Sequence, residues 1–97
     1  MNLTEFQSSL VNADPPESFP PALQALWLDG KSNWQGAHER LQEADDSDSA
    51  WVHAYLHRKE GDLSNASYWY RRAGQPVASG PLDAEWAAIA QALLAES

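Results

Sequence analysis

The chain has 97 residues, the size of one domain, a net charge of −8 and no cysteine. The absence of cysteine excludes disulfides and thiolate chemistry and fits a reducing compartment, so we expect a cytoplasmic protein. The acidic balance argues against nucleic acid and anionic membranes as partners, because both require a basic surface. Residues 1–5 have neither the basic nor the apolar region of a signal peptide, so we expect none. No run approaches the ~20 apolar residues of a membrane helix.

Residues 1–20 are predicted to form a short helix and a stiff connector. Asn2 can cap a helix over residues 2–12, with Glu5 in the capping-box position. Four prolines between residues 13 and 21 then favour a rigid linker, because proline removes a backbone donor and restricts the residue before it.

Two helices are predicted over residues 21–29 and 33–44. In the first, Leu23, Leu26 and Trp27 follow the i, i+3, i+4 spacing of a buried helix face. The apolar stripe of the second consists of Trp34, Ala37, Leu41 and Ala44. An acidic loop over residues 45–49 comes next, in which Asp48 or Ser49 is expected to cap the following helix.

A second pair of helices is predicted over residues 49–60 and 63–73, separated by a Gly61–Asp62 turn and ended by Gly74. The helix over 49–60 has apolar residues on a broad arc and Ala54 on the opposite side, which indicates burial between neighbouring helices. The inward side of the next helix is expected to carry Leu63, Ala66, Trp69, Tyr70 and Ala73. A final amphipathic helix over 82–94 then caps the stack.

An internal repeat supports this pairing. The pattern Trp34-x-x-Ala37-x-x-x-Leu41-x-x-Ala44 returns 29 residues later as Leu63-x-x-Ala66-x-x-x-Tyr70-x-x-Ala73. With Gly61 and Asp62 before it, the second copy resembles the second half of a tetratricopeptide (TPR) repeat. The run Tyr68-Trp69-Tyr70-Arg71-Arg72-Ala73 is similar to the close of a Sel1-like repeat. The stretch from His53 to Asp62 also resembles the signature of a family of small microbial proteins without an assigned activity.

These patterns predict a single all-α domain over residues 1–97, a small right-handed bundle of about six helices. It would comprise the N-terminal helix and linker over 1–20, two TPR-like antiparallel hairpins over 21–76 and a capping helix over 80–95. The TPR resemblance implies a protein-binding or peptide-binding module.

The preferred functional prediction is a site for a protein, an acidic peptide or a small carboxylate. Paired arginines suit bidentate carboxylate binding, and aromatic rings can form the walls of such a site. The candidate binding residues are His53, His57, Arg58, Tyr68, Arg71 and Arg72.

The alternative is a site for a divalent metal such as zinc, or a hydrolytic site built on the same histidines. His53 and His57 stand four residues apart, so a helix points both toward one place. His38 would join them if its helix packs alongside, and Glu60 or Glu39 could complete the set. Hydrolysis would also need a nucleophile, for which Ser64 and Ser67 are near in sequence, but no recognised catalytic motif surrounds them. A third interpretation is that the histidines and tyrosines only satisfy buried polar groups.

Overall fold

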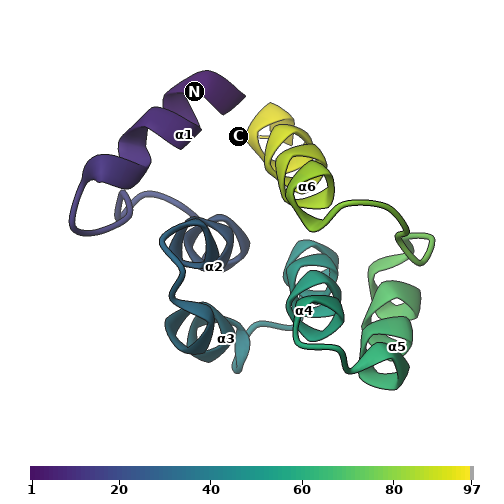
Figure 1. Ribbon diagram of the computed structural model, residues 1–97. Helices are drawn as coiled ribbons and strands as arrows, with labels where there is room; N and C mark the ends of the chain where they lie inside the picture. Colours follow the sequence, from purple (N-terminus) through teal and green to yellow (C-terminus); the bar gives the residue numbers. More distant parts are fainter. Residues whose placement is uncertain (97) are drawn as a thin grey trace.

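The structure, a computed structural model, describes residues 1–96 and contains only helices and connecting segments over that range. In chain order the helices are α1 (Leu3–Ser8) with the 3-10 turn η1 (Ser9–Val11), α2 (Pro21–Gly30), α3 (Trp34–Leu41), α4 (Ser47–Lys59), α5 (Leu63–Ala73) and α6 (Leu82–Glu96). The predicted all-α bundle of six helices is therefore confirmed (Figure 1).

Local capping sets several helix ends where the sequence predicts them. The Asn2 side chain accepts from the Glu5 amide at 2.8 Å, and the Glu5 carboxylate accepts from the Asn2 amide at 2.9 Å. Asp62 caps the start of α5, and Gly61 precedes it at φ +88°. Gly74 ends α5 in the left-handed conformation, at φ +71°, that glycine adopts without steric cost.

Three local predictions are wrong. Asp46, rather than Asp48 or Ser49, caps α4, because its carboxylate accepts from both the amide and the hydroxyl of Ser49. The helix over 33–44 is shorter than predicted, since α3 ends at Leu41. Leu63 is 64% exposed instead of buried. As the first residue of α5 its side chain tilts toward the helix start, beyond the end of the packed hairpin.

Helix α4 occupies the middle of the bundle. It pairs with α5 across a short turn, as α2 pairs with α3, and it also contacts α2, α3 and α6. Figure 1 shows α2, α3, α4 and α5 following one another, with α6 returning over them toward α1. Every residue from Ser49 to His57 is consequently buried, apart from the half-buried Trp51. The long-range partners of the polar side chains of α4 therefore lie mainly on the helices packed around it.

The main core lies between α1, α2, α3, α4 and α6, where each fully buried large apolar side chain stabilises the fold by about 1.5–3 kcal/mol. Its largest members are Phe6, Leu23, Leu26, Trp27, Leu41, Leu56, Trp86 and Ile89. A smaller cluster of Ala54, Ala66 and Tyr70 joins α4 to α5, where the two alanines allow close approach of the helices.

Buried polar groups tie α4 to α6 and α5. Arg58 donates to the Glu85 carboxylate at 2.7 Å and also to the Gly80 carbonyl, while the Tyr70 hydroxyl donates to the same Glu85. Glu85 is only 8% exposed. Burial and this carboxylate raise the pKa of Tyr70, which keeps its hydroxyl a donor.

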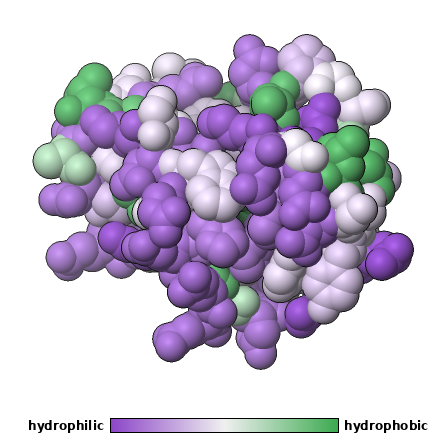
Figure 2. All heavy atoms as spheres, turned by 60° about the horizontal axis from the view of Figure 1, so that its bottom comes forward, coloured by the Kyte–Doolittle hydropathy of each residue, from purple (hydrophilic) through white to green (hydrophobic). Residues whose placement is uncertain are grey.

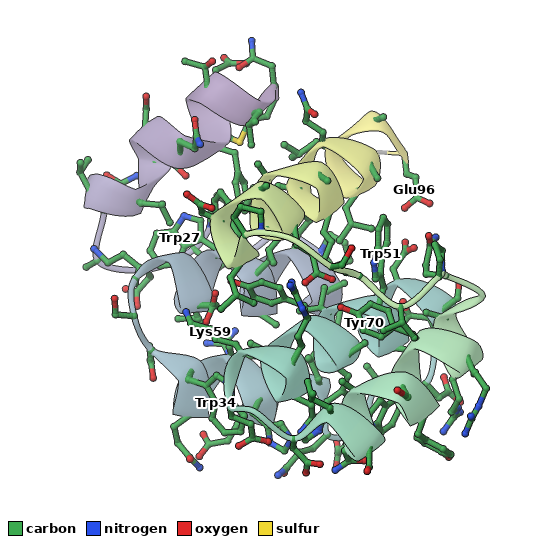
Figure 3. All side chains as sticks on the ribbon, turned by 45° about the vertical axis from the view of Figure 1, so that its right-hand side comes forward. Trp27, Trp34, Trp51, Lys59, Tyr70 and Glu96 are labelled. Carbon is green, nitrogen blue, oxygen red and sulfur yellow. The ribbon has the colours of Figure 1, made fainter. Side chains whose placement is uncertain are left out.

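A second polar group ties α4 to the end of α2. The carboxylate of Asp29, 4% exposed, accepts from the Tyr55 hydroxyl at 3.0 Å and from the Lys59 ammonium at 2.9 Å. Figure 3 shows Lys59 and Tyr70 at separate places along the space between α6 and the layer that contains α4. On this side of α4 the buried charges have partners of opposite charge.

Among the described helices, none has both the length and the apolar character needed to cross a membrane. Figure 2 shows the face that comes forward when the bottom of Figure 1 is turned toward the viewer. It is mostly hydrophilic, with small and separate hydrophobic areas.

Candidate metal centre

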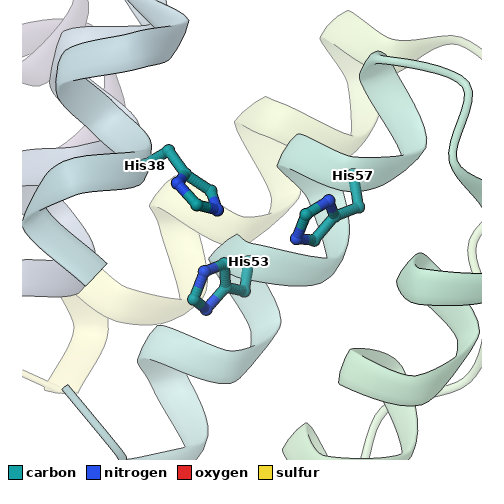
Figure 4. Close-up of side chains that lie close together, drawn as sticks. All are labelled: His38, His53 and His57. Atoms are coloured by element: carbon teal, nitrogen blue, oxygen red, sulfur yellow. The ribbon is translucent and has the colours of Figure 1, made fainter. Parts of the chain in front are cut away.

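Three histidines converge on the side of α4 that faces α3. The ring centroids of His38 and His53 lie 5.0 Å apart, those of His38 and His57 5.5 Å, and those of His53 and His57 5.6 Å. One potential ligand nitrogen from each ring lies within 4.8 Å of the others. Figure 4 shows His38 reaching from α3 toward the two rings on α4.

Helix periodicity and one interhelical hydrogen bond produce this arrangement. His53 and His57 are one turn apart on α4, so their side chains project from the same stripe. The Trp34 indole on α3 donates to the Leu56 carbonyl of α4 at 3.0 Å, which sets how α3 lies against α4. His38, one turn after Trp34, is thereby brought opposite the pair.

Two tryptophans form walls of the cluster. The Trp34 ring stacks on His38 with centroids 5.0 Å apart and an interplanar angle of 8°. The Trp69 ring, from α5, stacks on His53 at 4.1 Å and 23°. The cluster is thus closed by apolar surface on two sides, and His38, which is half-buried, provides its more open side.

The hydrogen bonds leave ring nitrogens available for a ligand. His57 Nδ1 lies 2.7 Å from the Glu60 carboxylate, which favours a proton on Nδ1 and leaves Nε2 with its lone pair. His53 Nδ1 is buried and has no hydrogen-bond partner among the residues the structure describes. A buried nitrogen without a partner costs free energy, and a metal ion is one group that can satisfy it.

Burial lowers the pKa of two of the imidazoles. At His53 burial is the main cause, and His38, His57 and Arg72 add to it, so the pKa falls to about 4. The pKa of His38 is lowered by burial and by His57, against the opposing effect of two nearby glutamates. Both rings are therefore neutral at pH 7, which is the form that binds metal.

This geometry suits a transition metal after a small closure of the rings. A zinc ion bound at ~2.1 Å to three nitrogens holds them roughly 3.4 Å apart, closer than the 4.8 Å limit found here. Rotations about the side-chain bonds can supply the difference, because His38 is half-buried. Three imidazole ligands leave a fourth position for water or another ligand, as in zinc sites with three protein ligands.

Glu60 lies beside the cluster and contacts His57 through Nδ1. Glu60 is therefore placed to orient a metal-binding histidine. It does not lie at the centre of the three rings, where a fourth ligand would be. A second group of possible ligand atoms consists of His57, Glu60 and Asp62. Both acidic residues there are exposed and already bonded, Glu60 to His57 and Asp62 to the Asn65 amide.

The structure separates the six predicted binding residues into three places. His53 and His57 lie in the cluster, while Arg58 turns toward α6 and its ion pair with Glu85. Tyr68 and Arg72 share a face of α5, with the Arg72 guanidinium 5.2 Å from the Trp69 ring centroid. Arg71 is exposed on the same helix.

Reasoning from the sequence did not predict the hydrogen bond from Trp34 to α4 or the contact between Glu60 and His57. The i, i+4 spacing of Trp34 and His38, and the i, i+3 spacing of His57 and Glu60, were the available signals.

Comparison of the chain with models of known protein families, with curated proteins and with solved structures finds no match. The likeness to TPR and Sel1-like repeats and to the microbial signature therefore stays a prediction.

Proposed function

We propose that this chain is a metal-binding protein that holds one divalent transition metal ion between His38, His53 and His57. The observation that carries the proposal is the convergence of three imidazoles from two helices, with a buried His53 nitrogen that has no other partner among the described residues. A bound ion would satisfy that nitrogen and remove the cost of burying it.

The ligand set indicates which metals fit. Three imidazoles without thiolate suit zinc, copper, nickel or iron, whereas magnesium and calcium prefer oxygen ligands. Zinc is the first choice because it accepts three histidines and one open position without a redox partner. The cytoplasmic location expected from the sequence belongs to the same proposal.

Such an ion would join the two hairpins. His38 belongs to α3 of the first hairpin, and the other two ligands belong to α4 of the second. Because the acidic segment over residues 42–46 is the only covalent link between them, a metal would add a cross-link at their interface. The proposed role is therefore a structural or metal-storing one, and it needs no catalytic group.

Zinc titration of the purified, metal-free protein tests the proposal. We expect one equivalent to bind at pH 7, and cobalt(II) to give the visible absorption of a tetrahedral site. Replacing any one ligand, as in His38→Gln, His53→Gln or His57→Gln, should weaken zinc binding by more than about a hundredfold, since outer-shell changes alone cost about 10–100-fold.

Glu43→Gln is the control, because it removes one exposed carboxylate without removing a histidine. It should leave zinc affinity unchanged. If the wild-type protein binds zinc no better than a variant lacking all three histidines, the proposal is wrong.

A second candidate function rests on the exposed side of α5. Tyr68 is 45% exposed, and the Arg72 guanidinium lies over the rings of Tyr68 and Trp69, which forms an aromatic and cationic surface on an otherwise acidic protein. It suits an acidic peptide or a small carboxylate. Arg71→Glu with Arg72→Glu should then abolish capture of an acidic peptide while the far-ultraviolet circular dichroism stays the same.

A further inference from the structure

A pocket of about 550 Å³ lies on the opposite side of α4 from the histidines. It opens between η1, the end of α2, the end of α4 and the start of α6. Its size is within the range of sites for small organic ligands. None of the histidines lines it, so it is independent of the proposed metal function.

The lining of the pocket includes a buried charge. Asp29 lines it and is 4% exposed, and aspartate is rarely buried so deeply without a reason. Its two oxygens accept from Tyr55 and Lys59, but a carboxylate offers about four lone-pair positions, so each oxygen can accept once more.

The electrostatics of the pocket favour a cation. Asp29 and Asp83 contribute two negative charges against the single positive charge of Lys59, and the chain as a whole has a net charge of −8. The C-terminal ends of α2 and α4 also meet here and contribute partial negative charge through their helix dipoles, which outweighs the partial positive charge at the start of α6.

Apolar side chains form the remaining wall. Leu10, Leu82 and Trp86 line the pocket, and the Trp86 indole nitrogen is already satisfied by the Leu26 carbonyl at 2.9 Å. The indole therefore offers its ring as apolar surface, which also attracts cations. Ser32, which also lines the pocket, is the only described residue other than glycine with a positive φ, 63°. This conformation costs free energy and is frequent at functional sites.

We infer that this pocket binds a small organic ammonium, a primary amine with an aromatic or aliphatic group, and that Asp29 is its counter-ion. The ammonium donates to Asp29, and the apolar group packs on Leu10, Leu82 and Trp86. In the ligand-free protein the Lys59 ammonium occupies the place of the ligand ammonium. Its side chain is 38% exposed, so it can move aside toward solvent.

A series of probes that differ only in charge tests the inference on the wild-type protein. Ligand-observed NMR and titration of the backbone amide signals would compare 2-phenylethylamine, 2-phenylethanol and 3-phenylpropanoate. The amine should bind at least about tenfold more tightly than the alcohol, because it adds a charge-assisted hydrogen bond, and the acid should bind most weakly. Shifts should centre on residues 29–32 and 82–86.

Two variants make the test specific. Asp29→Asn keeps the shape of the side chain and an acceptor for Tyr55, and should abolish the preference for the amine. Lys59→Met removes the internal competitor and should increase affinity for the amine by about tenfold. If Lys59 instead anchored carboxylates, this variant would lose binding of the acid and gain nothing with the amine.

The inference is overturned if the acid binds as tightly as the amine, or if none of the three probes binds. It is also overturned if amine binding survives in Asp29→Asn, because that result would indicate attraction to the acidic surface in general. Should Asp29→Asn fail to fold, the charge series on the wild-type protein and the Lys59→Met variant still decide between these outcomes.

Discussion

The buried polar groups on the two sides of α4 have opposite kinds of partner. Toward α2 and α6, Tyr55, Arg58 and Lys59 meet the carboxylates of Asp29 and Glu85, and charges of opposite sign balance. Toward α3, His53 and His57 meet another histidine, and groups of the same kind converge. In the first arrangement the charges balance, whereas the second lacks a central partner. A metal ion should therefore be sought in the second arrangement.

The largest effect should come from breaking the satisfied side. Glu85→Leu would leave Arg58 and Tyr70 without their shared acceptor, so we expect the free energy of unfolding to fall by about 3–5 kcal/mol, measured by urea denaturation. The double variant Arg58→Met with Glu85→Leu should recover part of this loss, because it leaves no unpaired charge but still leaves the Tyr70 hydroxyl without its acceptor. A loss below about 1 kcal/mol in the single variant would show that the network contributes little.

Acid should act mainly on the histidine side of the metal-free protein. The pKa of His53 is about 4 in the folded state and near 6.5 when unfolded, so between these values the unfolded chain binds more protons. Stability is therefore full above pH 6.5 and falls as the pH drops toward 4, by up to about 3 kcal/mol. Urea unfolding of wild type and His53→Gln from pH 7 to 4 isolates this contribution. Parallel pH curves for the two proteins would refute it.

The carboxylate beside the cluster should affect metal affinity more weakly than the ligands do. Glu60→Ala removes the acceptor that orients His57, and zinc affinity should fall about a hundredfold, or ~2.7 kcal/mol. Glu60→Gln keeps an acceptor without the charge and should cost about tenfold. Glu43→Gln, which changes an exposed glutamate between α3 and α4, serves as the control. Equal affinities in all four proteins would remove Glu60 from the site.

The smallest effect is expected from removing a histidine when no metal is present. His53→Leu deletes the buried nitrogen that has no partner and keeps a similar volume, so the unfolding free energy should stay within about 1 kcal/mol of wild type or increase. This result would contrast directly with Glu85→Leu on the other side of the helix. A loss of 2 kcal/mol or more would mean that the ring contacts themselves stabilise the fold.

Much of the fold could be predicted because its determinants are local. The capping box at Asn2, the turn at Gly61 and Asp62, and the end at Gly74 depend on residues within one helical turn. The start of α4 could not be fixed, because several neighbouring Asp and Ser residues are all good caps. In the structure Asp46 is the cap, and its carboxylate accepts from both the amide and the hydroxyl of Ser49.

The candidate site could be predicted only in part. The spacing of His53 and His57 shows that they share a stripe, but whether His38 meets them depends on how α3 lies against α4, which a hydrogen bond from Trp34 helps to set. The sequence also could not predict that Arg58 points toward α6, since its partner Glu85 is 27 residues away. Long-range partners of this kind leave no periodic signal.

The stacking of Trp34 on His38 and of Trp69 on His53 makes the cluster optically visible. Indole emission is quenched by a protonated imidazole in contact with it and by a paramagnetic ion such as copper(II) nearby. The fluorescence of two of the five tryptophans should therefore decrease when the histidines bind protons or copper(II). A diamagnetic ion such as zinc should not quench it in this way. The protein thus contains an intrinsic fluorescent reporter of its own histidine cluster, which can be followed without any attached label.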